Sequence, residues 1–165
     1  MNEAQRLVDL IPRLRRYARA LVSDRASADD LVQDTLERAW AKLHLYRRGT
    51  DLRAWLFTVM HNVHVNKVRS ARATDPLDDE MPELAQRAAQ GDSLVVRDLD
   101  RAIARLPDEQ RAVLLLVTLE EMSYDEVARA LGIPIGTVMS RLSRAREKLR
   151  GMMLGQAAAK LKVVK

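Results

Sequence analysis

The segment that most restricts the possible fold of this chain covers residues 123–149 and reads SYDEVARALGIPIGTVMSRLSRAREKL. Ser123, followed three residues later by Glu126, is typical of a helix start, because each side chain can bond a free backbone amide of the other residue. Gly132 is suited to the left-handed residue that ends a helix, and Pro134 prevents the helix from continuing. Two helices joined by a short turn that contains glycine predict a helix-turn-helix.

The second helix of this motif has two different faces. The residues predicted to pack are apolar: Val138, Leu142, Ala145 and Leu149. The residues predicted to face outward are polar or basic: Thr137, Ser140, Arg141, Arg144 and Lys148. A free basic face can enter the major groove of DNA, where arginine donates two hydrogen bonds to guanine. An ordinary arginine-rich surface helix is the alternative, although five basic residues and one acid over 141–150 favour DNA binding.

The first part of the chain is also predicted to be helical. Apolar residues recur at the three-four spacing of one helical face over 7–21, 28–43 and 52–63, and these stripes include Trp40 and Trp55. Aromatic residues make up only 4% of the chain, and Leu, Ala, Arg and Glu are abundant. This composition favours helix over strand, so we expect an all-α protein.

Two local signals predict where the early helices begin. Pro12 lies inside the first apolar stripe, so that helix should either kink or restart there. Ser27, with Asp30 three residues later, resembles a capping box and predicts the start of the second helix.

Charge divides the chain into three parts. Residues 1–72 carry 14 Lys/Arg and 8 Asp/Glu, residues 73–100 carry 2 and 8, and residues 101–165 carry 12 and 7. Prolines and a loss of periodicity within the acidic part are typical of a linker. We therefore predict two small helical domains joined by an acidic linker. The predicted bounds are 1–72 for a three- to four-helix bundle, 73–93 for the linker, 94–151 for the domain with the helix-turn-helix, and 152–165 for a frayed tail.

Longer stretches of sequence carry a family resemblance. LPDEQRAVLLLVTLEEMSYDEVARALGIPIGTVMSRLSRAREKLR resembles region 4 of extracytoplasmic-function sigma factors of the sigma-70 family, and ADDLVQDTLERAW with DLRAWLFTVMHNVHVNKVR resembles regions 2.2 to 2.4. The resemblance implies a cytoplasmic, non-enzymatic subunit that binds core RNA polymerase at the β′ clamp and the β flap. It also implies recognition of the minus-ten and minus-thirty-five elements of promoter DNA, and control by an anti-sigma factor.

The same resemblance implies roles for individual residues. The set that would dock on the β′ clamp is Asp30, Gln33, Asp34, Glu37 and Arg38. The set that would meet the minus-ten element is Asn62, Asn66, Lys67, Arg69 and Arg72. In the helix-turn-helix, Ser140, Arg141 and Arg144 are expected at bases, and Thr137 and Lys148 at phosphates. Met139 stands where many relatives carry a basic residue, which leaves one minus-thirty-five contact open. Its side chain would either touch a thymine methyl or only cover the DNA backbone, and we favour the second.

A dimeric helix-turn-helix regulator that acts without core polymerase is the main alternative. His61 and His64 have a spacing that can hold a metal, but the chain has no cysteine and no dense carboxylate cluster near them, so we expect neither metal nor cofactor. No apolar run approaches the roughly 20 residues that a membrane-spanning helix needs, so membrane insertion is not expected. A further hypothesis is that the acidic linker folds back on a basic lobe.

Overall fold

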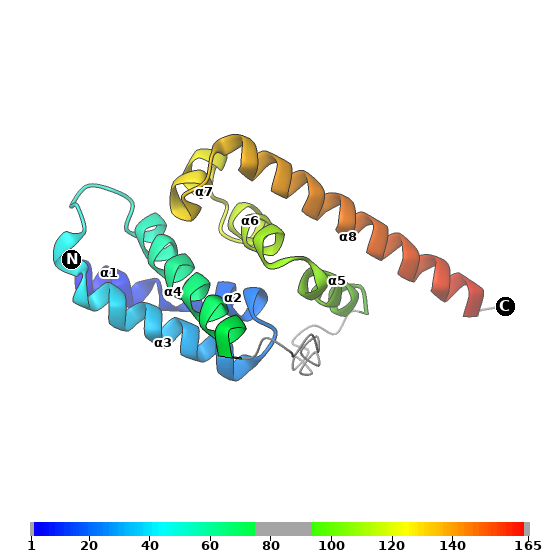
Figure 1. Cartoon of the computed structure of the whole chain (residues 1–165), viewed down its shortest axis with the longest axis horizontal. Coiled ribbons are helices and arrows are strands. Elements are labelled where there is room, and N and C mark those ends of the chain that lie inside the picture. The colour runs from blue at the N-terminus through cyan, green and yellow to red at the C-terminus, as the bar shows by residue number, and fades with distance from the viewer. Residues whose placement is uncertain (1, 75–93, 164–165) are drawn as a thin grey trace.

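The computed structural model describes residues 2–74 and 94–163, and within these ranges every regular element is a helix. The elements are α1 Glu3–Asp9, α2 Ile11–Leu21, α3 Arg25–Ala41, the short 3-10 helix η1 Leu43–Leu45, α4 Leu52–Thr74, α5 Leu94–Arg105, α6 Asp108–Thr118, α7 Tyr124–Leu131 and α8 Ile135–Val163 (Figure 1). The prediction of an all-α protein is confirmed. The predicted linker at 73–93 begins within α4, and its remainder, 75–93, lies outside the described residues.

The starts of the early helices follow from single side chains. Pro12 lies in the first turn of α2, so the chain restarts a helix there rather than kinking one. The side chain of Asp24 accepts a hydrogen bond from the backbone amide of Ser27 at 3.2 Å and caps α3. The predicted capping box of Ser27 and Asp30 is therefore wrong. The hydrogen bonds from Ser27 lower the pKa of Asp24.

The helix-turn-helix forms as the sequence predicts. Ser123 Oγ accepts a hydrogen bond from the amide of Glu126 at 3.2 Å, and Gly132 ends α7 in the left-handed conformation with φ of 66°. The second helix is longer than predicted, because α8 continues to Val163 and the expected frayed tail at 152–165 is helical over its described part. The extension contains alanines at 157–159, the residue type that favours helix most, and it passes Gly151 and Gly155.

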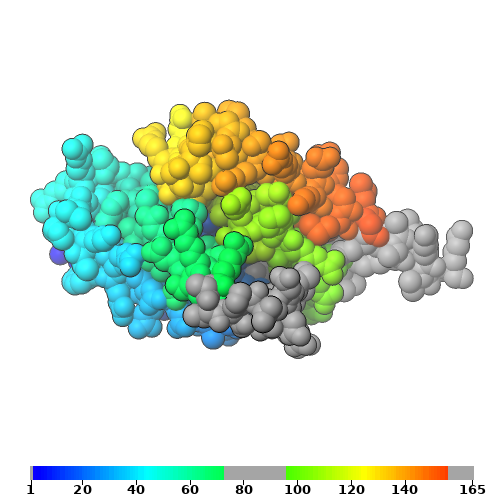
Figure 2. All heavy atoms as spheres, in the orientation of Figure 1, coloured from blue at the N-terminus to red at the C-terminus, as the bar shows by residue number. Residues whose placement is uncertain are grey.

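The helices form two groups that pack against each other. We call residues 2–74 the first half and residues 94–163 the second half. Within the first half α3 packs on α2 and α4, and within the second half α8 packs on α5, α6 and α7. The halves meet where α4 lies against α7 and where α2 lies against α5 and α6. In the space-filling view, the yellow and orange atoms of α7 and α8 rest on the green atoms beneath them (Figure 2).

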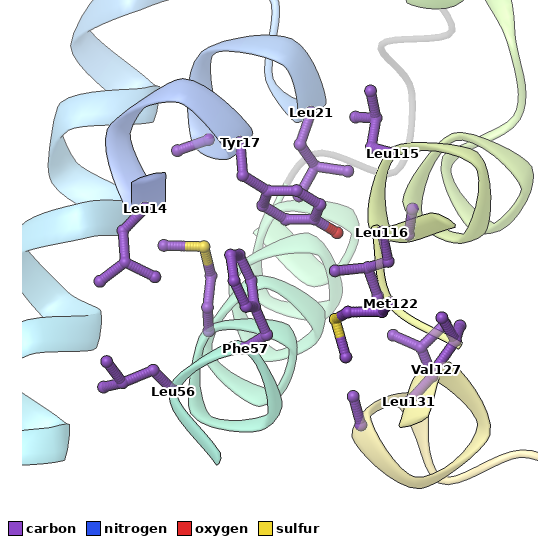
Figure 3. Close-up of a cluster of buried hydrophobic side chains, with 14 of the residues drawn as sticks. Leu14, Tyr17, Leu21, Leu56, Phe57, Leu115, Leu116, Met122, Val127 and Leu131 are labelled. Carbon is purple, nitrogen blue, oxygen red and sulfur yellow. The ribbon is translucent and has the colours of Figure 1, made fainter. Parts of the chain in front are cut away.

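Both halves contribute to one hydrophobic core. Tyr17 and Phe57 of the first half make an edge-to-face ring contact, with centroids 5.1 Å apart and planes at 73°. These side chains point toward Leu116, Met122 and Val127 of the second half (Figure 3). All five residues belong to the same buried cluster. The two predicted domains are thus closed over a shared apolar interior.

The predicted apolar stripes are mostly buried, with one clear exception. Trp40 is 62% exposed, so its assignment to the core of α3 is wrong. The buried line of α3 runs through Leu31, Thr35 and Ala39, and Trp40 stands one residue, about 100°, beyond it. Trp55 is half-buried and packs beside Tyr46, with ring centroids 5.6 Å apart.

Candidate nucleic-acid and protein interfaces

The outer face of α8 is open as predicted. Ser140, Arg144 and Lys148 are exposed, and Thr137 is partly covered. The Ser140 hydroxyl donates to the backbone carbonyl of Thr137 at 3.2 Å. Because the apolar side of α8 is buried, packing holds this row of donors toward solvent.

Arg141 occupies a different position from its neighbours on α8. Its side chain is 26% exposed, and its Nη2 lies 3.6 Å from Oε2 of Glu109 on α6. To bond a DNA base or phosphate, the guanidinium must leave this carboxylate. Sequence reasoning placed Arg141 on the open face and did not find its partner, because Glu109 lies on a different helix.

Met139 is 48% exposed beside an open groove between α7 and α8. The groove is lined by Tyr124, Met139, Leu142, Ser143, Arg146, Glu147 and Arg150. Its lining is mixed: Met139 and Leu142 are apolar, and Arg146 and Arg150 bring two cations to it. Because Met139 is half-exposed, its thioether can contact a neighbouring surface.

The last turns of α4 carry the residues predicted to meet the minus-ten element. Asn62, Asn66, Arg69 and Arg72 are exposed, and their spacing places them along one side of the helix. Lys67 differs, because its Nζ lies 2.6 Å from Oδ2 of Asp34 on α3. This ion pair joins a residue predicted to contact DNA to one predicted to contact polymerase.

A groove between α3 and α4 surrounds that ion pair. It is lined by Asp34, Glu37, Arg38, Val63, Asn66, Lys67 and Ser70. The two predicted sets of residues, for polymerase and for the minus-ten element, therefore meet in one depression. A protein bound over α3 and a nucleic acid bound along α4 would be neighbours.

The predicted docking face of α3 is accessible. Asp30, Gln33, Glu37 and Arg38 are exposed, and Asp34 is half-buried against Lys67. Trp40 lies seven residues after Gln33 and three after Glu37, so its exposed indole is on the same side of α3. The sequence pattern missed this because tryptophan fitted the apolar stripe.

Polar contacts between the halves form a site that the sequence did not predict. Arg53, at the start of α4, donates from Nη1 to the backbone carbonyl of Glu120 at 2.8 Å, and its Nη2 lies 3.5 Å from Glu126 of α7. His64, 8% exposed on α4, lies with Nε2 2.8 Å from Oδ1 of Asp108. Burial of Asp108 acts to raise its pKa, but the hydrogen bond from His64 and the charge of Arg111 lower it below the ordinary value.

Arg111 ties the ends of several helices together. Its guanidinium donates to the backbone carbonyls of Ile103, Ala104 and Leu106 at 3.0, 2.8 and 2.6 Å. It also donates to the carbonyl of Leu21, across the interface, at 2.8 Å. Helix ends leave carbonyl groups without intrahelical partners, so one side chain here stabilises the ends of α2 and α5 at once.

Glu120, in the connection between α6 and α7, is a buried carboxylate. Its side chain is fully buried, and neither oxygen accepts a hydrogen bond within the described part of the chain. Arg16 Nη2 is 3.6 Å from Oε1, an ion-pair distance rather than a hydrogen bond. Burial raises the pKa of Glu120, although Arg16, Arg13 and Arg53 oppose the rise.

No helix within the described residues is long and apolar enough to cross a membrane.

Comparison with known proteins identifies both halves. Residues 7–61 match the family described as the Sigma2 domain of PhyR, and residues 97–149 match Sigma-70, region 4. The chain is 35% identical over 145 residues to the ECF RNA polymerase sigma factor EcfG of Rhodopseudomonas palustris, covering 87% of this chain and 80% of that protein. It is also 35% identical over 142 residues to SigM of Mycobacterium tuberculosis, covering 85% and 71%.

Solved structures agree with these sequence matches. The sigma factor RpoE from Bartonella quintana, in complex with the anti-sigma factor NepR, superposes with a TM-score of 0.80 at 36% identity, covering 91% of this chain and 95% of that one. CnrH, in complex with the cytosolic domain of CnrY, gives 0.67 at 26% identity, covering 93% and 91%. The matches extend across both halves and occur in the order that the motifs predict. The chain belongs to the ECF family of RNA polymerase sigma factors.

Proposed function

We propose that this sigma factor binds core RNA polymerase through α3 and the second half, and sets α4 and α8 on the two promoter elements. The observation that carries the proposal is that exposed donors and cations gather on the outer sides of these two helices, one in each half. In this role the chain catalyses no reaction of its own. It acts in the cytoplasm as part of the polymerase.

In region 4, here 94–151, Ser140 and Arg144 of α8 would read base edges in the minus-thirty-five element. Thr137 and Lys148 flank them and would bond phosphates. Arg141 would join them once it leaves Glu109, so its contribution is reduced by the loss of that ion pair. The β flap of polymerase would hold this domain on the enzyme.

In region 2, here 1–72, Asn62 and Asn66 would meet an unstacked base of the minus-ten element. An asparagine amide suits this role, since it both donates and accepts hydrogen bonds. Lys67, Arg69 and Arg72 would bond the phosphates beside that base.

The β′ clamp would dock on the exposed side of α3, formed by Asp30, Gln33, Asp34, Glu37 and Arg38. These side chains are individually weak anchors, since an exposed ion pair contributes roughly 0 to 1 kcal/mol. Affinity must therefore come from several of them together.

An anti-sigma factor is a further expected partner. The structures of RpoE and CnrH each hold a bound partner, and RpoE is similar to this chain over nearly its whole length. A partner of that class would keep this sigma factor from polymerase until a signal releases it.

Run-off transcription from a pool of promoters tests the proposal. Core polymerase with this protein should produce defined start sites that are absent without it, and the upstream sequences should share two elements. If polymerase gained no start sites while the protein alone bound a palindromic sequence, the proposal would be replaced by the dimeric regulator.

A further inference from the structure

One of the cations predicted to meet DNA is paired with an acid in the free protein. Lys67 Nζ lies 2.6 Å from Oδ2 of Asp34, which is a short contact between opposite charges. Asp34 belongs to α3 and Lys67 to α4, two helices that pack side by side (Figure 1). Arg69 and Arg72, the other two cations of the predicted minus-ten set, are exposed farther along α4. Lys67 differs from them because an anion accompanies it.

The acid beside Lys67 belongs to the helix that is predicted to face polymerase. Residues 52–74, which form α4, contain no Asp or Glu, so no neighbour on the same helix can neutralise the lysine. The acids that line the groove around the ammonium are Asp34 and Glu37, both on α3 and both in the set predicted to dock on the β′ clamp. The charge of this part of the minus-ten surface therefore depends on a surface that polymerase would cover.

The carboxylate of Asp34 competes with DNA phosphate for the same ammonium. A protein gains affinity for a nucleic acid when its cations replace the small ions that surround the phosphates. A lysine that Asp34 neutralises replaces fewer of those ions, and the carboxylate itself repels a phosphate that approaches. Lysine carries its charge on a flexible four-carbon stem, so the ammonium can move to a phosphate once Asp34 is engaged by another cation.

We propose that Asp34 is a positioning residue for Lys67: in the free protein it holds the ammonium away from the minus-ten strand, and docking of the β′ clamp on Asp34 releases that ammonium to a phosphate. The inference rests on the proposed function, because the clamp is the partner that takes Asp34. A basic group on the clamp supplies the cation that replaces Lys67. Polymerase binding and DNA binding then strengthen each other by the same factor, as two linked equilibria must.

The strength of the ion pair suits such an exchange. The side chains of Asp34 and Lys67 are 46% and 40% exposed, so water screens their attraction. A pair of this kind changes an equilibrium by at most about fivefold, the equivalent of about 1 kcal/mol. Docking of the clamp can therefore break the pair, and the release of Lys67 still changes DNA binding by a measurable amount.

Binding of the free protein to a labelled single strand of thymidines tests the pairing, since phosphate contacts do not depend on sequence. Asp34→Asn should bind this strand about three- to fivefold more tightly than the parent does. Its log affinity should also fall more steeply with log salt concentration, by about 0.7 in slope, the contribution of one more phosphate contact on a single strand. Asp34→Glu keeps the charge and should keep the slope of the parent.

Asp29→Asn is the matched control for these measurements. Asp29 is an exposed acid of α3 that does not line the groove, so its removal changes the net charge equally without releasing Lys67. The effect of Asp34→Asn must also pass through the lysine. In a Lys67→Gln background, Asp34→Asn should change neither the affinity nor the slope, because no ammonium remains to be released.

The same comparison on polymerase tests the release. The probe is a single strand that carries the minus-ten sequence read from run-off start sites, and core polymerase is present at saturation. The parent and Asp34→Asn should bind this probe with equal affinity, because the clamp has released Lys67 in the parent.

Three results would overturn the inference: a free Asp34→Asn protein that behaves like Asp29→Asn, a gain in affinity that survives in Lys67→Gln, and a gain that persists on polymerase. If circular dichroism shows that Asp34→Asn unfolds, Asp34→Ser removes the same charge and replaces it in every measurement. If Asp34→Asn gained affinity through Lys67 but polymerase yielded no start sites, the sigma role would be overturned, and with it the clamp as the releasing partner.

Discussion

α4 and α8, the two longest of the described helices, both carry residues proposed to meet DNA, yet they are packed very differently. α4 lies between α3 and α7, so Leu56, Phe57 and Met60 are all buried. α8 is covered only on the side that faces α5, α6 and α7, and its last turns extend past α5 (Figure 1). A substitution at one of these buried positions of α4 should therefore change stability first, whereas one on the outer side of α8 should change DNA binding alone.

The largest effect is expected at Phe57. Phe57→Ala removes a ring that is 2% exposed and packed edge-to-face on Tyr17, so the free energy of unfolding should fall by about 3–5 kcal/mol. Urea denaturation followed by circular dichroism measures this. Phe57→Leu, which keeps most of the volume, should cost less than about 1.5 kcal/mol. Equal losses for the two variants would show that the site does not depend on close packing.

The second effect is expected at Arg111. Arg111→Lys removes the planar guanidinium that bonds four carbonyls, including that of Leu21, and should lower the free energy of unfolding by about 1.5–3 kcal/mol. Arg105→Lys, at an exposed position of α5, is the control and should change it by less than about 0.5 kcal/mol. If Arg111→Lys left the free energy of unfolding unchanged, water would be replacing the lost hydrogen bonds at no cost.

The third effect concerns α8. Arg144→Ala should leave the free energy of unfolding within about 0.5 kcal/mol of the parent, because the side chain is exposed. Binding of the polymerase complex to its promoter should weaken by about 1–3 kcal/mol, and only for promoters with the base that Arg144 reads. Lys148→Ala should weaken binding similarly on every sequence. If Arg144→Ala also weakened binding equally on every promoter sequence, Arg144 would be assigned to a phosphate contact rather than a base contact.

The smallest effect is a pH dependence from Glu120. Because burial raises its pKa in the folded chain, the folded state holds the proton more tightly, and stability falls as pH rises from the unfolded pKa through the folded one. Glu120→Gln has no carboxyl group to ionise and so lacks this loss. The melting temperature of the variant should therefore rise relative to that of the parent as pH rises from 4 toward 8. If the difference in melting temperature between the variant and the parent stayed constant with pH, the charge of Arg16 would be offsetting the effect of burial on Glu120.

The helices themselves could be predicted because their signals are local. Ser123 and Gly132 set the ends of α7 through bonds and backbone angles within a few residues. Asp24 and Ser27 are both good capping residues, so local sequence could not choose between them. The prediction that Trp40 is buried was wrong, because an apolar residue at the margin of a stripe is buried only if another helix packs against it.

The faces of α8 and α3 could also be predicted, since spacing decides which residues share a side. The pairs Asp34 with Lys67 and Glu109 with Arg141 could not, because each joins two helices and no sequence period encodes such a contact. The interface between the halves was missed for the same reason. Tyr17 belongs to the apolar stripe of its own helix, and Phe57 lies next to one. Neither stripe shows that the second half of the chain covers these two side chains.

The long separations within the interface also matter while the protein is being made. Arg53 precedes Glu120 by 67 positions. At about 5–20 residues per second, a ribosome needs roughly 3 to 13 seconds to add the partner of Arg53. During that interval the nascent first half has no second half to cover Phe57 and Tyr17. The unfinished chain therefore presents an apolar surface to chaperones and to neighbouring nascent chains, and production of the complete protein depends on how quickly translation supplies α6 and α7.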